Sequence, residues 1–145
     1  MRCQVTFLTT IALVVLPVSA QSAEKKLIWP KGASTAGPYT PGILAGDTLY
    51  VSGQIGRDAS GNIPSEFEAE VKQVIANAEA ILKEAGMSLA DVVSVQVYLT
   101  DMELFQRMNA AYTSLFKEPR PTRTTVGVAK LVGPARIEIT MTAKK

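Results

Sequence analysis

Arg123 and Glu138 are the two residues whose side chains and positions most favour chemistry. Arg123 stands at the entrance to a predicted strand, and Glu138 lies between two isoleucines in the last predicted strand. A guanidinium can hold a substrate carboxylate through two parallel hydrogen bonds, and a carboxylate partly withdrawn from water can act as a general base. The alternatives are a structural ion pair between the two side chains or a surface Glu on an edge strand. Composition and spacing alone favour these structural interpretations.

The composition narrows what chemistry is available. The chain has 145 residues, no His and one Cys, and its 15 basic and 13 acidic residues give a net charge of +2. These counts exclude Ser–His–Asp triads, Cys–His dyads, histidine-ligated metal sites, thiolate zinc clusters and intramolecular disulfides. The weak charge is also atypical of nucleic-acid binding. Catalysis must therefore use Arg, Lys, carboxylates, hydroxyls, amides, backbone groups and water.

Three further polar residues have more than one interpretation. Ser52, followed by Gly53, could be a nucleophile, but no base accompanies it, and a polar strand residue beside a close backbone approach is preferred. Tyr39 could line a pocket or cover the edge of the core. Asn109 could cap a helix, bridge two segments or contact a ligand.

Residues 1–20 predict a secretory signal peptide. Arg2 gives a positive start, an apolar stretch follows, and Val18–Ala20 places short residues at the −3 and −1 positions of a cleavage site. An uncleaved membrane anchor is the alternative, but the apolar run is short for a membrane span. Cleavage after Ala20 leaves one domain, residues 21–145, whose net charge is +1 because Arg2 is the only charged residue removed. We expect a periplasmic or secreted protein without stable membrane association.

The elements that position these residues follow from periodicity. Residues 21–46 are rich in Gly, Pro, Ser and Thr and indicate an extended arm with turns at Gly37-Pro38 and Pro41-Gly42. A strand around Leu27–Trp29 is an option within this arm. Thr48–Ile55 alternates as a strand, with Leu49, Val51 and Ile55 on one face and Tyr50, Ser52 and Gln54 on the other. A helix is predicted from Ser65, with a Ser65–Glu68 capping box and Gly86 just past its end.

The remaining elements are predicted in the same way. Asp91–Leu99 predicts a strand with Val93, Val95, Val97 and Leu99 on one face. Asp101 can cap a second helix that reaches about Phe116. Two strands, Arg123–Leu131 and Arg136–Ala143, close the chain.

Two helices can cover only one face of the resulting sheet. The other face is polar but carries few charges, where a solvated face would normally hold more Lys and Glu. Its residues are Tyr50, Ser52, Gln54, Ser94, Gln96, Glu138 and Thr140. We therefore expect this face to pack against other subunits in a symmetric oligomer.

Five short motifs, in order over residues 33–143, resemble the Rid family of reactive intermediate deaminases, also called YjgF-like. They are Gly37-Pro38-Tyr39, Ser52-Gly53-Gln54-Ile55, Asn109-Ala110-Ala111-Tyr112, Pro121-Thr122-Arg123-Thr124-Thr125-Val126 and Ile137-Glu138-Ile139. The resemblance implies a chorismate-mutase-like α+β subunit, a mixed sheet with two helices on one face, in a homotrimer with clefts between subunits. It also implies hydrolysis of enamines and imines, such as 2-aminoacrylate and 2-iminopropionate, to a 2-keto acid and ammonia without a cofactor or metal.

The resemblance also implies residue roles. Arg123 would bind the substrate carboxylate, and Glu138 would hold the attacking water or move its proton. Backbone groups around Gly53 and Thr125 would orient the water and the imine nitrogen, and the cleft would be lined by Tyr39, Ser52 and Asn109. The expected partners are a small imino or keto acid and further copies of the chain, with no nucleic acid.

Two other functions stay open at this point. A non-catalytic trimer could bind small carboxylates in the same clefts, which would need Arg123 but not Glu138. A chaperone-like role is the other, and no sequence feature here indicates it.

Overall fold

The computed structural model describes residues 24–33 and 38–145. The expected signal peptide and Gly37 lie outside these residues. Two strands at the start of the described chain precede the predicted β–α–β–α–β–β order. The elements are β1 (Lys25–Ile28), β2 (Gly42–Ala45), β3 (Thr48–Ile55), α1 (Phe67–Glu84), the 3-10 turn η1 (Leu89–Asp91), β4 (Val92–Leu99), the 3-10 turn η2 (Met102–Leu104), α2 (Phe105–Leu115), β5 (Thr122–Gly127) and β6 (Ile137–Lys144).

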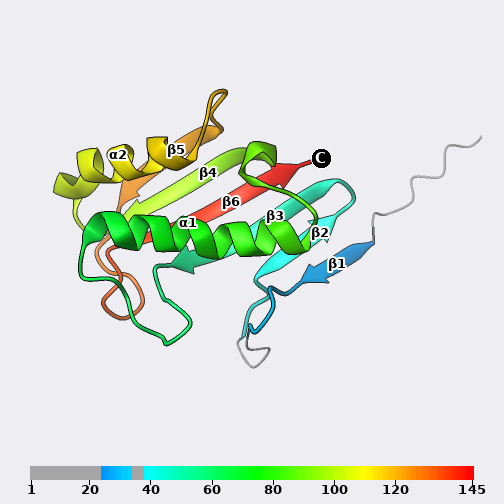
Figure 1. The fold of residues 1–145 in the computed structure, drawn as a ribbon, viewed down its shortest axis with the longest axis horizontal. Helices are drawn as coiled ribbons and strands as arrows, with labels where there is room; N and C mark the ends of the chain where they lie inside the picture. The colour runs from blue at the N-terminus through cyan, green and yellow to red at the C-terminus, as the bar shows by residue number, and fades with distance from the viewer. Residues whose placement is uncertain (1–23, 34–37) are drawn as a thin grey trace, which may run out of the picture.

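One mixed sheet has the strand order β1-β2-β3-β6-β4-β5. All neighbouring strands are antiparallel except β4 and β5, which are parallel. Both helices lie on the same face of the sheet, with α1 crossing β3 and β6 (Figure 1). This confirms the expected α+β class, with a mixed sheet and two helices on one face. No helix within residues 24–33 and 38–145 is long and apolar enough to cross a membrane.

Helix α1 forms because its apolar residues recur at helical spacing and bury one stripe against the sheet. That stripe contains Phe67, Val71, Val74, Ile75, Ala78, Ile81 and Leu82. Gly86 has a φ of 67°, the left-handed conformation expected just past a helix end. The prediction of a Ser65–Glu68 capping box is wrong, because the N-cap of α1 is Glu66, which makes no side-chain cap hydrogen bond. The carboxylate of Glu68 instead receives two hydrogen bonds of 2.7 Å from Arg107.

The N-terminal arm contains two strands, β1 and β2, and its composition did not predict β2. β1 agrees with the strand considered around Leu27–Trp29, but β2 begins at Gly42, where a turn was expected. Gly42 is needed because α1 approaches closely: an added Cβ there would lie 2.6 Å from Ile81 Cγ2. Hydrogen bonding to strands on both sides fixes β2 despite its weak propensity. β1 ends the sheet and carries exposed Lys25 and Lys26.

Two register shifts interrupt the predicted alternation. In β3 the shift lies between Val51 and Gln54, and it pairs Ile55 with Glu138. Because paired residues project from the same face, Ile55 shares the face of Glu138, contrary to the expectation. In β4 the shift lies between Val92 and Ser94. Val92 takes the buried position, while the side chain predicted for it, Val93, is 48% exposed.

The last elements follow the sequence closely. The side chain of Asp101 accepts a hydrogen bond of 2.8 Å from the Glu103 N–H and caps η2, which leads into α2. β6 agrees with the predicted final strand to within one residue. β5 ends at Gly127, four residues before the predicted end. Residues 128–136 instead form the connection to β6.

Candidate active site

Glu138 lies in a cleft of about 510 Å³ at one end of the sheet. The cleft is lined by Tyr39, Ser52, Gly53, Gln54, Ile55, Arg57, Asn77, Val132 and Glu138. The structure therefore brings together four of the seven predicted site residues: Tyr39, Ser52, Gly53 and Glu138. Ile137 and Ile139 are fully buried beneath the helices, so alternation directs Glu138 to the opposite face.

Gly53 makes room for the Glu138 carboxylate. A Cβ at Gly53 would overlap Oε1 of Glu138 and lie 2.9 Å from its Cδ. Gly53 belongs to the irregular segment of β3, and the amide of Gln54 donates to its carbonyl at 3.2 Å. The close backbone approach expected at Ser52–Gly53 is thus an approach to the candidate base itself.

We expect Gly53→Ala to inactivate the cleft without unfolding the chain. The new methyl group must push the Glu138 carboxylate aside, and a displacement of about 1 Å in a reacting group can lower a rate about 100-fold. Hydrolysis of a 2-imino acid, the substrate class that the resemblance implies, measures the loss of activity. The urea midpoint of unfolding measures any loss of stability. Ser60→Ala, at an exposed position of the following turn and outside the cleft lining, is the control. Full activity of Gly53→Ala would show that Glu138 does not act from this position.

Arg123 belongs to a second cluster, beneath α2. Its Nη2 donates to Asn109 Oδ1 at 2.7 Å, and its guanidinium carbon lies 4.7 Å from the ring centroid of Tyr112. The centroid of the Phe105 ring lies 5.8 Å from the same carbon. A planar cation held by an amide and aromatic faces is fixed in orientation, and its remaining N–H groups can bind a carboxylate. Asn109, which was open to several interpretations, is a positioning partner of Arg123.

Thr125 completes this second cluster. It follows Arg123 by two residues on β5 and therefore projects to the same face. Burial raises the pKa of the Tyr112 hydroxyl, which the positive charge of Arg123 partly opposes, so the phenol stays protonated. The buried Thr125 Oγ1 and Tyr112 Oη have no hydrogen-bond partner among residues 24–33 and 38–145. Buried polar atoms are normally paired, so these two hydroxyls mark this cluster as a candidate site for a polar ligand.

The two clusters lie on opposite faces of the sheet. Arg123 pairs with the buried Val95 and contacts α2, whereas Glu138 pairs with Tyr98 on the face without helices. An ion pair between them does not form within this chain. The structural interpretation favoured by composition alone is therefore wrong for this pair. A site that uses both residues must take them from two copies.

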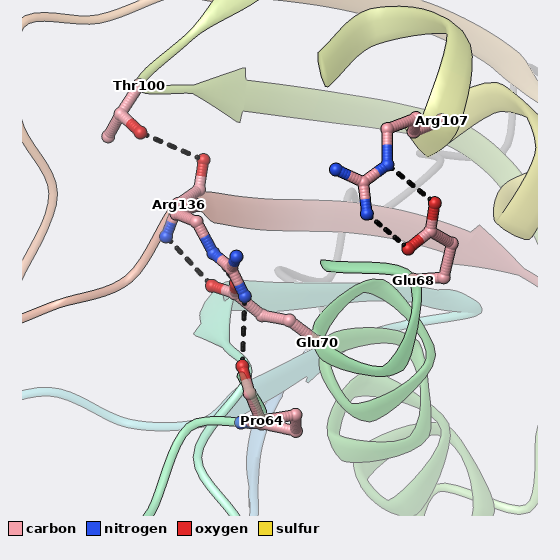
Figure 2. A network of polar contacts seen from close by, with 6 residues as sticks. All are labelled: Pro64, Glu68, Glu70, Thr100, Arg107 and Arg136. Atoms are coloured by element: carbon pink, nitrogen blue, oxygen red, sulfur yellow. Dashed lines mark hydrogen bonds and ion pairs between the residues drawn. The ribbon is translucent and has the colours of Figure 1, made fainter. Parts of the chain in front are cut away.

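A buried ion pair fixes the start of β6, two residues before Glu138 (Figure 2). Glu70 is fully buried and accepts hydrogen bonds from the backbone N–H of Arg136 at 2.8 Å and from its Nε at 2.6 Å. Arg136 also donates to the Pro64 carbonyl at 2.9 Å, and its own carbonyl accepts from the Thr100 N–H at 3.0 Å. This network joins α1, β4 and the loop before α1 at the base of β6. It thereby holds the backbone that carries Glu138.

The second ion pair in Figure 2 joins the two helices at the surface. Hydrogen bonds from Arg107 lower the pKa of Glu68 to about 2, so this carboxylate is ionised at neutral pH. Neither residue lines the cleft, and their hydrogen bonds join α2 to α1.

Sequence reasoning missed five residues of the cleft. Gln54 and Ile55 belong to a quoted motif but were not assigned to the site, and Arg57, Asn77 and Val132 were not singled out. Asn77 lies on α1 and donates to the carbonyls of Ile55 and Arg57, both at 2.9 Å. The available signal was a polar residue on the flank of an amphipathic helix, which alone does not specify its partner. Across the described part of the chain, no group of three or more His, Cys, Asp or Glu side chains could hold a metal ion.

Known proteins resemble this chain in sequence and in fold. Residues 31–145 match the family described as endoribonuclease L-PSP. The chain belongs to the Rid family. The crystal structure of RidA from the Antarctic bacterium Psychrobacter sp. superposes with a TM-score of 0.78 at 34% identity, covering 83% of this chain and 99% of that one. The YjgF gene product of E. coli superposes with a TM-score of 0.79 at 31% identity, covering 84% and 99%.

Similar proteins include RutC family proteins and imine deaminases. A RutC family protein of Saccharolobus solfataricus is 43% identical over 117 residues, which are 79% of this chain and 93% of that protein. The 2-iminobutanoate/2-iminopropanoate deaminase of Bos taurus is 38% identical over 111 residues, which are 75% and 81% of the two chains. Rid relatives of this chain thus include a named imine deaminase.

Proposed function

We propose that this protein is a 2-iminobutanoate/2-iminopropanoate deaminase-like hydrolase, which converts 2-imino or enamine acids to 2-keto acids and ammonia. The observation that carries the proposal is the pair of half-sites on opposite faces of one sheet. One half-site holds a fixed guanidinium, Arg123, and the other holds a carboxylate, Glu138, in a cleft. A closed oligomer, for which we propose a homotrimer, would join the two halves between neighbouring copies.

The proposed mechanism needs only proton transfers. Arg123 of one copy binds the substrate carboxylate through two N–H groups, and Tyr39, Ser52 and Gly53 of the neighbouring copy line the opposite wall. Glu138 accepts a proton from water as the water oxygen bonds to the imine carbon, and it then passes this proton to the nitrogen, which restores the carboxylate. The resulting carbinolamine then returns its hydroxyl proton through Glu138 to the nitrogen. The carbon–nitrogen bond breaks, which leaves a 2-keto acid and ammonia.

Little more than positioning is required of the protein. The imine carbon is already electrophilic, so a correctly held water removes most of the barrier. Backbone groups around Gly53 and Thr125 would orient the water and the nitrogen. The part of the chain that supplies these groups contains neither thiol nor imidazole, and the mechanism uses neither.

A coupled assay tests the proposal on protein lacking residues 1–20. An amino-acid oxidase generates imino acids from a panel of amino acids, catalase removes peroxide, and ammonia release is followed with and without the protein. We expect the protein to accelerate release. A non-catalytic carboxylate binder would give a different result. It would accelerate ammonia release from no substrate, and calorimetry would show that the Glu138→Ala variant still binds a 2-keto acid.

We also propose that the protein acts outside the cytoplasm after cleavage behind Ala20. The support is the charge and apolar pattern of residues 1–20. N-terminal sequencing of the chain from a periplasmic or culture fraction tests this. Residue 21 at the N-terminus is expected, and an intact Met1 in the cytosol would contradict it.

A further inference from the structure

Arg57 lies in the same cleft as Glu138, on the same chain. Ile55 pairs directly with Glu138, and Arg57 follows Ile55 by two residues and lines the same cleft. Arg57 is therefore within reach of a substrate whose reacting carbon lies at Glu138. The mechanism proposed above does not use this guanidinium.

The backbone around Arg57 is rigid. The Asn77 amide binds the carbonyls of Ile55 and Arg57, and the Arg57 N–H donates to Ile55 at 2.9 Å. Asp58 then closes the following turn by accepting from the N–H groups of residues 60 and 62 at 2.9 and 2.8 Å. A guanidinium on such a support loses little freedom when it binds a ligand.

The Arg57 guanidinium is oriented by its neighbours, and only some of its N–H donors are used. Its Nη1 donates to the Gly61 carbonyl at 3.0 Å, and its Nη2 lies beside Gly133 in the connection between β5 and β6. None of the ion pairs within residues 24–33 and 38–145 includes Arg57. Because a guanidinium has five N–H donors, it retains donors for an anion in the cleft.

The cleft also has space and apolar walls between Glu138 and Arg57. Its volume of about 510 Å³ lies within the range of roughly 300–1,000 Å³ that suits drug-sized ligands, well beyond a three-carbon imino acid. Ile55 and Val132 both line it, and Val132 is 67% exposed. A short aliphatic chain could pass these side chains and end at the guanidinium.

We propose that Arg57 makes the cleft selective for 2-imino acids whose side chain ends in a second carboxylate. This inference rests on the proposed deaminase function. Arg123 of the neighbouring copy holds the carboxylate next to the imine, and Arg57 holds the one at the far end. The selectivity follows because each carboxylate meets its own fixed guanidinium.

The test compares two five-carbon substrates that differ at the far end. Imino acids are generated by oxidase from glutamate, which has a terminal carboxylate, and from norvaline, which has a methyl group. Ammonia release gives kcat/KM for the wild-type protein, Arg57→Gln and Arg57→Lys. Lys72→Gln, which removes a charge from the exposed face of α1, is the control.

We expect Arg57→Gln to lower kcat/KM for the glutamate-derived substrate roughly 10- to 100-fold and to leave the norvaline value within about twofold. Arg57→Lys should retain part of the preference, and Lys72→Gln all of it. Equal losses on both substrates, or none, would overturn the role of Arg57 while the deaminase function stands. If the wild-type protein accelerates ammonia release from neither substrate, the deaminase function is overturned, and this inference with it.

Discussion

Replacing Arg123 with Ala or Glu138 with Gln should each reduce imine hydrolysis to the uncatalysed rate. Arg123→Ala removes the guanidinium that would hold the substrate carboxylate. Glu138→Gln keeps the shape of the side chain but removes the proton acceptor, and general-base contributions are typically about 100- to 10,000-fold. Ammonia release in the oxidase-coupled assay measures both losses.

A mixture of the two inactive variants should regain activity. In one chain the two side chains lie on opposite faces of the sheet, so each site would take Arg123 from one copy and Glu138 from another. When the variants are co-expressed equally and assemble at random, roughly a quarter of the sites receive both intact residues. The mixture should therefore show about a quarter of wild-type activity.

The mixing experiment distinguishes a shared site from a site within one chain. If both residues act from the same copy, no mixed oligomer contains an intact site, and the mixture stays inactive. Glu103→Gln, on the exposed surface of η2, serves as the charge control and should retain full activity. Full activity of either single variant would refute the role assigned to that residue.

Glu70→Ala should destabilise the fold by about 3 kcal/mol. The carboxylate is fully buried and holds the Arg136 side chain and backbone N–H together. Its removal leaves that N–H without its acceptor and the guanidinium without its partner, although the Arg136 side chain is 33% exposed and retains some solvent. The urea midpoint of unfolding measures the change.

Two comparisons sharpen this stability prediction. Glu68→Ala breaks a pair that is exposed on both sides, and it should shift the midpoint far less. Replacing Glu70 and Arg136 together with Leu should recover part of the loss, because the unpaired guanidinium is removed while the backbone N–H of residue 136 still lacks its acceptor. A Glu70→Ala midpoint equal to that of the wild-type protein would show that the network does not support β6.

The parts of the fold that the sequence predicts are those with one dominant periodicity. The stripe from Phe67 to Leu82 has helical spacing and becomes α1, and the alternation around Ile137 and Ile139 becomes β6. β2 escapes prediction because Gly42 resembles a turn residue until Ile81 is known to pack over it. The register shifts at Ser52–Gly53 and Val93 depend on neighbouring strands, which local patterns do not contain.

The site divides in the same way. Motifs identify Arg123 and Glu138 individually, because each lies at a recognisable place in a strand. Their separation onto opposite faces depends on the register of both strands against β4, where Arg123 pairs with Val95 and Glu138 pairs with Tyr98. Arg57 escapes prediction for a related reason. Its place in the cleft is set by Asn77, which comes from α1 twenty residues later.

The unequal ends of the sheet determine what kind of assembly the chain can form. β1 presents Lys25 and Lys26 at one end, and such lysines oppose the addition of another strand through charge repulsion and the cost of removing them from water. β5 ends the other side without lysine. Head-to-tail stacking of β1 on β5 would extend without limit into fibres, and the lysines disfavour that contact. The lysines on β1 therefore favour closed oligomers over open filaments.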